Sequence, residues 1–154
     1  MTDSIAEQIA AKVATRLAST TGVSDVVRPT KEGGFQPKDY QIIVTQDDIS
    51  IDEALACPGN PPATAWVLPF QIVGVLRPSE LSTVAIAKLK NEFWAAVISA
   101  LCGVANWWTW DGLAIDSRHS GVVDYTGEDG SNGFVVTLNV TFRTDENNPF
   151  NLRG

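Results

Sequence analysis

The sequence predicts a single domain that contains both α-helices and β-strands. Two stretches repeat apolar residues at three- and four-residue spacing, as amphipathic helices do, and several shorter stretches are rich in β-branched and aromatic residues. The chain has 154 residues, of which 44% are apolar and 19% charged, and this composition suits one compact domain with a sizeable core. We therefore expect neither a disordered nor a fibrous chain.

The first helix is expected over residues 4–20. Ile5, Ile9, Val13 and Leu17 follow one another at four-residue spacing and form one apolar stripe. Ser4 and Glu7 have the spacing of a capping box, in which the serine hydroxyl and the glutamate side chain satisfy free amides of the first turn. Gly22 favours the left-handed conformation that often ends a helix.

Strands are expected over residues 23–28 and 40–45, and between them Pro29 and a polar loop that ends in Gly33 and Gly34 break the first strand. Residues 46–64 then form a long loop with an acidic cluster, which consists of Asp47, Asp48, Asp52 and Glu53. Loops of this length are often functional, so this one is a candidate for contact with a partner. A solvated excursion explains it equally well.

The next strand is expected over residues 65–77, and Pro69 within it implies an edge position, a bulge or a break. A second helix is expected to begin at Ser79 or Ser82 and to end at Cys102, before Gly103. Between residues 93 and 105 only Ser99 is polar. A helix that is apolar on every side must be covered on every side, so this stretch predicts contacts beyond one sheet.

The C-terminal third is expected to consist of short strands at 113–117 and 122–125, a turn-rich segment and a last strand at 134–143. Asp129-Gly130 and Asn132-Gly133 suit tight hairpins. In the last strand the apolar residues occupy alternate positions, which places them on one face; they are Phe134, Val136, Leu138, Val140 and Phe142. Residues 145–154 are expected to be a polar tail that frays, or an arm that docks on a neighbour.

No pattern in the sequence predicts an enzyme. The densest polar group contains every residue type of a hydrolytic triad, but neighbours on one strand seldom converge as a triad must; it consists of Asp111, Asp116, Ser117, His119, Ser120 and Asp124. Cys57, Cys102 and His119 are too few for a zinc site, and two isolated cysteines predict reduced thiols in a cytosolic protein. The carboxylates at residues 128–132 fit turn chemistry better than a calcium loop. We expect no catalytic, metal or cofactor site.

Charge and aromatic residues point instead to protein contacts. The net charge is −7, and all of the excess lies in residues 47–154, which disfavours adhesion to nucleic acid or to an anionic membrane. The start of the chain lacks the features of an export signal, and the most apolar stretch is too short to span a bilayer. Tryptophans fill cores but also dominate interfaces, so either role is open for the set near the second helix, which is Trp94, Trp107, Trp108 and Trp110.

The order of these segments resembles the tail terminator family of long-tailed bacteriophages, the lambda-type minor tail U proteins and their relatives. The resemblance runs over about residues 5–144. It rests on the N-terminal helix, the strand Asp39-Tyr40-Gln41-Ile42-Ile43-Val44-Thr45, the acidic loop, the strand at 66–76, the segment Arg77-Pro78-Ser79-Glu80-Leu81 before the second helix, and the alternating last strand. The insertion at 57–62 and the tail after Asp145 are longer than the family pattern.

The resemblance implies an α+β fold, with a mostly antiparallel sheet packed by two main helices in a domain at 1–144 and a tail or arm at 145–154. It also implies six copies closed into a ring that caps the tail tube, stops its elongation and presents a surface to head-completion proteins. DNA would pass through the channel without being held. Such a structural protein belongs to the virion tail or neck, and to the host cytoplasm during assembly.

Two sets of residues are assigned on this basis. The tryptophan set is expected at the subunit interface, and the acidic set, Asp47, Asp48, Asp52 and Glu53, is expected to face the channel or an axial partner. The alternatives are a head–tail connector or tail-completion protein of the same neck region, and, from another class, a small hydrolase or ligand-binding domain around residues 116–124.

Overall fold

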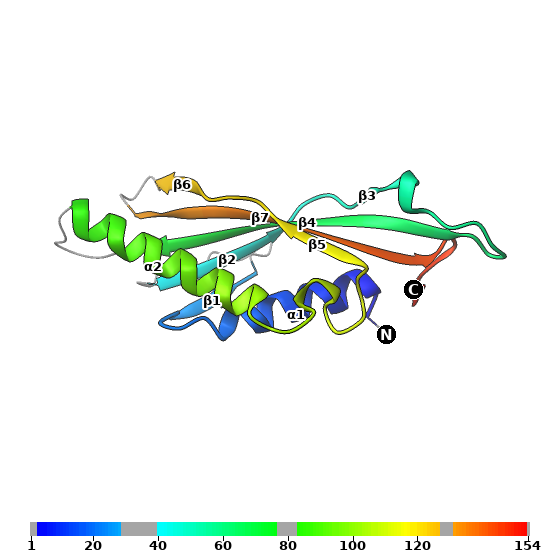
Figure 1. The fold of residues 1–154 in the computed structure, drawn as a ribbon, viewed down its shortest axis with the longest axis horizontal. Helices are drawn as coiled ribbons and strands as arrows, with labels where there is room; N and C mark the ends of the chain where they lie inside the picture. Colours follow the sequence, from blue (N-terminus) through cyan, green and yellow to red (C-terminus); the bar gives the residue numbers. More distant parts are fainter. Residues whose placement is uncertain (1–2, 29–39, 77–82, 127–130, 154) are drawn as a thin grey trace.

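The computed structural model describes residues 3–28, 40–76, 83–126 and 131–153. It contains two α-helices and an eight-stranded sheet in which most strand pairs are antiparallel, so the predicted α+β class is confirmed. The central pair is formed by β4 (Ala63–Leu76) and β7 (Asn132–Asp145), which pair along their whole lengths. These two strands give the molecule its elongated shape (Figure 1).

Shorter strands flank the central pair on both sides. On the β4 side lie β2 (Tyr40–Gln46) and β3 (Ser50–Ile51), and β1 (Asp25–Val27) pairs with β2 in parallel. On the β7 side lie β5 (Asp116–His119), β6 (Val123–Thr126) and β8 (Asn148–Leu152), all antiparallel to β7. Two 3-10 turns, η1 (Glu53–Leu55) and η2 (Trp107–Thr109), interrupt the connections.

Helix α1 (Ile5–Ala18) forms as its sequence predicts. Ile5, Ile9, Val13 and Leu17 are all buried, and the Ser4 hydroxyl accepts a hydrogen bond from the amide of Glu7. The Glu7 carboxylate does not complete a capping box with Ser4; it pairs with Arg28, which follows β1, at 2.9 Å. Gly22 has a φ of +83°, but the helix has already ended four residues before it.

Helix α2 (Thr83–Cys102) ends where predicted, with the amide of Gly103 bonded to the carbonyl of Ser99. Its predicted start at Ser79 or Ser82 lies outside the described residues. Phe93, Val97 and Leu101 are buried against the sheet, but the opposite side of the apolar stretch is not covered. Ala95 and Ser99 are exposed, and Val104 just after the helix is 50% exposed.

The core lies between the two helices and one face of the sheet. On β7 the five apolar residues of the alternating strand are all buried, as predicted: Phe134, Val136, Leu138, Val140 and Phe142. On β4 their register partners include Leu68, Phe70 and Ile72, which are also buried. The other face of β7 carries residues that are more exposed, among them Asn139. One face of the sheet is therefore core and the other wetter.

The helices do not cover the full length of the sheet. A 14-residue strand is about 46 Å long, whereas a 14-residue helix is about 21 Å long. In Figure 1 the sheet continues past the N-terminal end of α1, toward β3, η1 and the C-terminus. At that end the face that elsewhere forms the core lacks a helical cover.

Pro69 lies in the middle of the sheet, and its position explains how a long strand tolerates it. The Pro69 carbonyl accepts a hydrogen bond from the amide of Asp47, so this carbonyl points toward the β2 side of β4. The backbone nitrogen and oxygen of one strand residue point the same way, so the nitrogen of Pro69 also faces the β2 side. On that side β2 ends at Gln46, opposite Phe70, and β3 pairs only with Trp66 and Val67. The missing donor therefore falls in a gap between two neighbouring strands, which is the break that a proline predicts.

Several predicted boundaries were wrong. The strand expected at 113–117 begins three residues later, as β5 at Asp116, because residues 106–112 form a turn. Asn132 and Gly133 are the first residues of β7 rather than a turn, although β6 and β7 do form a hairpin. The C-terminal residues, expected to fray, form β8; the Arg153 guanidinium holds this strand through the Asp145 carboxylate at 2.7 Å. The loop expected from Pro29 to Gly34, and residues 127–130 of the expected turn-rich segment, lie outside the described residues.

Candidate subunit interface

The tryptophan-rich segment after α2 has an unusual backbone. Asn106, Trp110 and Asp111 have φ values of 56°, 48° and 60°, and Gly112 follows with 88°. A left-handed conformation costs a residue with a side chain about 1–2 kcal/mol, so surrounding contacts must hold this segment. Its amino-acid sequence alone does not predict the turn, since Trp110 is not a residue type that favours this conformation, although Asn106, Asp111 and Gly112 are.

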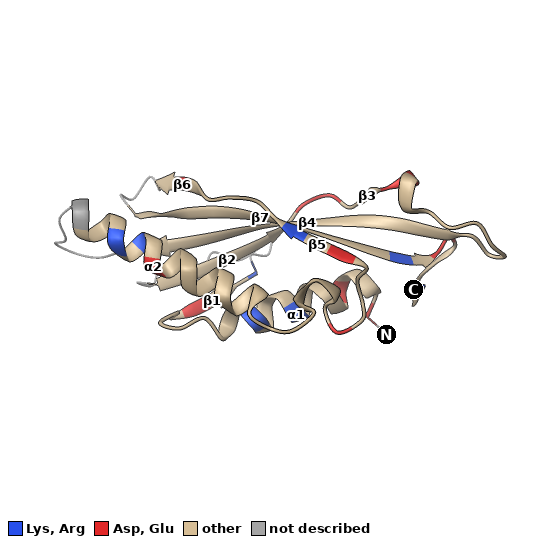
Figure 2. Ribbon diagram, viewed as in Figure 1, with Lys and Arg blue, Asp and Glu red and all other residues tan. Residues whose placement is uncertain are grey.

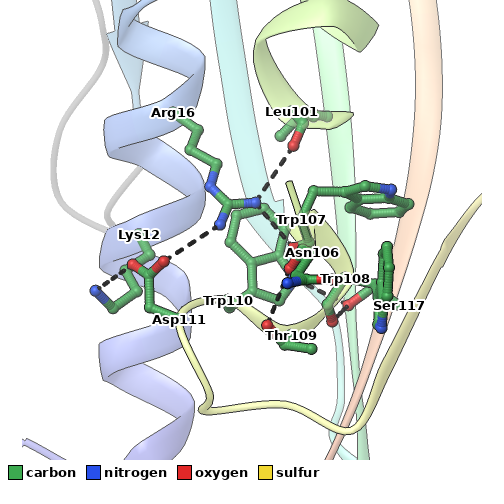
Figure 3. Close-up of polar contacts among 10 residues, drawn as sticks. All are labelled: Lys12, Arg16, Leu101, Asn106, Trp107, Trp108, Thr109, Trp110, Asp111 and Ser117. Carbon is green, nitrogen blue, oxygen red and sulfur yellow. Dashed lines mark hydrogen bonds and ion pairs between the residues drawn. The ribbon is translucent and has the colours of Figure 1, made fainter. Parts of the chain in front are cut away.

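Arg16 of α1 supplies most of those contacts (Figure 3). Its Nη1 donates to the carbonyls of Leu101 and Trp107, at 3.3 and 2.9 Å, and its guanidinium carbon lies 4.0 Å from the centroid of the Trp110 ring. The side chain of Arg16 is only 12% exposed. Burial lowers the pKa of Arg16, and the nearby carboxylate of Asp111 partly offsets this effect.

The indole of Trp110 belongs to the core. Its side chain is fully buried, and its Nε1 donates to the Ser117 hydroxyl at 2.9 Å. That hydroxyl in turn donates to the carbonyl of Trp108 at 2.7 Å, so β5 is tied to η2. Because no surface of Trp110 is available to a partner, its expected place at a subunit interface was wrong.

The other three tryptophans of the predicted set reach the surface of the domain. Trp108 is 40% exposed, whereas Trp94 and Trp107 are half-buried. The Trp107 ring lies 6.0 Å from the ring of His119 on β5. The Nε1 of Trp94 is buried and, among the described residues, has no hydrogen-bond partner. These three side chains remain candidates for contact with another protein.

Two further apolar surfaces were not predicted from the sequence. One consists of Ile49 and Ile51, which are 40% and 56% exposed on either side of Ser50. The other is at the start of β6, where Val122 and Val123 are 39% and 64% exposed; Val122 lines a cavity beside Trp94, and Val123 is opposite Val135 on the wetter face of the sheet. The apolar–polar alternation around Ile51 is the signal that predicts a strand with one apolar face, but only the sheet shows that this face is left open.

The acidic set surrounds the first of these surfaces. Asp47, Asp48 and Glu53 are exposed and Asp52 is half-buried, and Figure 2 shows acidic residues along the segment from β2 to η1. Asp52 caps η1 by accepting from the amide of Ala54, and Asp47 accepts from the side chain of Gln71 at 3.3 Å. The acidic set is therefore spread along one edge of the sheet, from Asp47, which bonds to Pro69 at its middle, to Glu53 in η1.

The residues that sequence reasoning weighed as a hydrolytic site serve separate structural contacts. The Ser117 hydroxyl is held between two tryptophans, as described above. Asp111 pairs with Lys12, Asp116 with Arg118 and Asp124 with Lys90, at 2.9, 3.3 and 2.7 Å. His119 is exposed, and its Nδ1 lies 3.2 Å from the carbonyl of Ser120. In this arrangement the three carboxylates are each engaged by a cation.

The two cysteines and the possible metal ligands are the remaining groups for which the sequence raised expectations. Cys57 and Cys102 are both free and half-buried, and burial raises the pKa of the Cys102 thiol, with Arg16 partly offsetting the effect. Within residues 3–28, 40–76, 83–126 and 131–153, no three or more His, Cys, Asp or Glu side chains gather where a metal ion would fit. In the same residues no helix has the length and apolar character needed to cross a membrane.

Comparison with known proteins gives no assignment. No protein-family model matches the chain, and a search of curated proteins found no significant match.

Proposed function

We propose that this chain is a structural virion protein, a phage tail terminator whose copies close into a ring of six on the end of the tail tube. The ring stops elongation of the tube and presents a joining surface to the head-completion proteins. The observation that carries the proposal is the apolar surface left open in one copy. It lies around Ile51 at one end of the sheet, at Trp108, and at Val122 and Val123, of which Val122 lies beside Trp94.

Exposed apolar surface of this kind favours a protein that functions in an assembly. Isolated apolar residues on a surface are ordinary, but groups of them usually mark contact sites. Here the groups occur beside half-buried tryptophans, which often contribute strongly to interfaces. The order of the elements also agrees with the resemblance to tail terminators, with an N-terminal helix, a strand and acidic segment, a long strand, a second helix and an alternating last strand.

The charge of the chain supports passage of DNA rather than binding. A net charge of −7 per copy disfavours adhesion of the ring to phosphate, and its acidic groups act over roughly 8 to 10 Å at physiological ionic strength. The engagement of Ser117 by two tryptophans supports an assembly role over a hydrolase, since a nucleophile must be free to attack.

Deletion of the gene from the phage that encodes it tests the proposal. A tail terminator predicts tails with overlong tubes in the deletion mutant, restored to normal length by the gene supplied in trans. Tails of normal length that stay detached from filled heads would indicate a connector or tail-completion protein instead. Catalytic turnover by the purified protein, without an assembly defect, would indicate an enzyme.

A further inference from the structure

Strand β3 lies at an open edge of the sheet. It pairs with β4 through Ser50 and Ile51, and with no other strand of the described residues. The amide of Asp52 donates to the carbonyl of Ala65 on β4. Because backbone groups alternate in direction along a strand, the N–H and C=O of Ile51 point away from β4. No hydrogen bond within the described part of the chain engages these two groups, so β3 offers both to an additional strand.

An apolar groove lies beside this strand. Ile51, Trp66 and Phe142 are register partners across β3, β4 and β7, so their side chains lie on one face. A cavity of about 200 Å³ opens on that face, lined by Ser4, Ala6, Ile49, Trp66, Phe142 and Pro149. The Nε1 of Trp66 already donates to the Thr144 hydroxyl at 2.9 Å, so this ring brings no unpaired donor to the groove. We call the segment Asp47–Glu53 and this groove the β3 edge.

The carboxylates of the β3 edge lack a cation. Within the described residues no ion pair involves Asp47, Asp48, Asp52 or Glu53. By contrast, every Lys and Arg of the same residues already contacts a carboxylate or a backbone carbonyl; these are Lys12, Arg16, Arg28, Lys88, Lys90, Arg118, Arg143 and Arg153. The described surface of a second copy would therefore bring more acid but no free cation to the β3 edge, and like charges weaken a contact. A different chain that carries Lys or Arg complements it.

We infer that the β3 edge binds an extended segment of a different protein, in which apolar residues alternate with lysine or arginine. The segment adds to β3 as a strand and forms hydrogen bonds with the N–H and C=O of Ile51. Main-chain hydrogen bonds supply affinity in strand addition, and pockets for alternate side chains supply specificity. In the proposed ring this segment belongs to the axial partner, so the inference rests on the proposed function for the source of the segment.

The two sides of β3 explain why the segment alternates. A residue placed opposite Ile51 on an added strand projects on the same face, toward the apolar groove. Ser50 and Asp52 alternate with Ile51 and face the other way, so the neighbouring residues of the segment meet the acidic side of the edge.

Charges on an edge strand often serve only to prevent it from pairing. The β3 edge combines its charges with features that favour pairing. Ile49 and Ile51 are exposed between the carboxylates, and the groove continues the core face of the sheet beyond the end of α1 (Figure 1). An apolar centre with a polar rim is the usual composition of a protein–protein contact.

Titration of the purified protein with a synthetic peptide tests the inference. The probe is a short end-capped peptide in which lysine alternates with valine. One control peptide has the same composition with all lysines at one end, and another has glutamate in place of lysine. We expect the alternating peptide to bind at least about tenfold more tightly than either control, because only it matches both sides of β3. Hydrogen exchange followed by NMR should show the Ile51 amide exchanging rapidly in the free protein and at least about tenfold more slowly with the peptide bound.

Two pairs of variants locate the binding. Ile51→Pro removes the outward N–H, yet leaves the pairing with β4 intact because that nitrogen does not bond to β4. We expect Ile51→Pro to abolish peptide binding and the matched control Ile51→Val to preserve it. Asp48→Lys reverses a charge of the β3 edge, and Glu92→Lys makes the same change at an exposed position on α2. Only Asp48→Lys should weaken binding, by about fivefold or more.

The outcomes separate the binding site from the function. The inference is overturned by a peptide that does not bind, by binding that survives Ile51→Pro or leaves the Ile51 amide unprotected, and by equal losses in Asp48→Lys and Glu92→Lys. A protein that dimerises through Ile51 in the absence of peptide also overturns it, since the occupant is then a second copy. All of these results leave the tail terminator proposal standing. Specific peptide binding together with tails of normal length in the gene deletion supports strand addition and overturns the proposed function.

Discussion

The guanidinium group of Arg16 lies over the ring of Trp110, with 4.0 Å between the guanidinium carbon and the ring centroid. The two residues are 94 positions apart, and their contact joins α1 to the strained segment after α2 (Figure 3). The same guanidinium holds the carbonyls of Leu101 and Trp107. Through this one side chain the N-terminal helix fixes the surface on which Trp107 and Trp108 lie.

Arg16→Ala should destabilise the domain by about 2–3 kcal/mol, because it removes a partly buried cation–π contact and two charged hydrogen bonds to carbonyls. Urea unfolding followed by tryptophan fluorescence measures the change. Lys12→Ala is the matched control, one turn away on the same helix and paired with an exposed carboxylate, and its unfolding midpoint should hardly move. Equal losses for the two variants would show that Arg16 has no special role.

Leu138→Asp should prevent folding. The side chain of Leu138 is fully buried at the centre of β7, between the sheet and the helices, and a carboxylate there would have to lose its hydration without a partner. Circular dichroism and gel filtration check the outcome. Asn139→Asp, the next residue and exposed on the other face, should fold normally. A folded Leu138→Asp protein would contradict the assignment of the faces of β7.

Gly133→Ala should cost at least about 2 kcal/mol of stability through overpacking in the sheet. A Cβ at Gly133 would overlap the carbonyl oxygen of Gly74 on β4, and backbone atoms cannot move aside as a flexible side chain can. Gly121→Ala provides the control, because a Cβ there meets no atom within 4 Å. If Gly133→Ala unfolds at the same urea concentration as the wild type, the close approach of β4 and β7 at this point is wrong.

Asp145 should contribute a pH-dependent part of the stability. Hydrogen bonds from Arg153 and Asn151 lower the pKa of its carboxyl group below the ordinary value. Since the folded state holds the proton more weakly than the unfolded state, the contribution is complete above the ordinary carboxyl pKa of about 3.9 and is lost as the pH falls through that value toward the folded pKa.

Asp145→Asn should therefore be less stable than the wild type at pH 7, and the difference should shrink as the pH approaches 2.5. Urea unfolding at a series of pH values gives the two profiles. The exposed Asp48 provides a control, since Asp48→Asn leaves the Asp145–Arg153 pair intact. Parallel profiles for Asp145→Asn and the wild type between pH 7 and 2.5 would mean that the pair does not hold β8.

The sequence predicts those elements whose apolar pattern is local. The stripe of Ile5, Ile9, Val13 and Leu17 and the alternation from Phe134 to Phe142 each identify a helix or strand and its buried face, because burial follows directly from spacing. The end of α2 is predicted from another local signal, Gly103, which directly follows Cys102.

The parts that were not predicted depend on distant residues. Trp110 is a core residue only because two residues from other elements complete its surroundings: Arg16 of α1 and Ser117 of β5. The β8 strand depends on pairing with β7 and on the Asp145–Arg153 contact. Ile51 and Val123 are ordinary strand residues in the sequence; Ile51 is exposed because the sheet extends beyond α1, and Val123 because it lies opposite Val135 on the face away from the helices. The sequence analysis proposed Trp94, Trp107 and Trp108 for a subunit interface, and these reach the surface of the domain, but it named none of the exposed residues Ile49, Ile51, Val122 and Val123.

The most direct test of the central claim is electron microscopy of the purified protein mixed with tail tubes of the phage that encodes it. The account predicts a ring of protein at one end of each tube, and tubes that no longer elongate when fresh tube protein is added. Protein that remains monomeric, leaves both ends of the tubes bare and does not affect their elongation would contradict it.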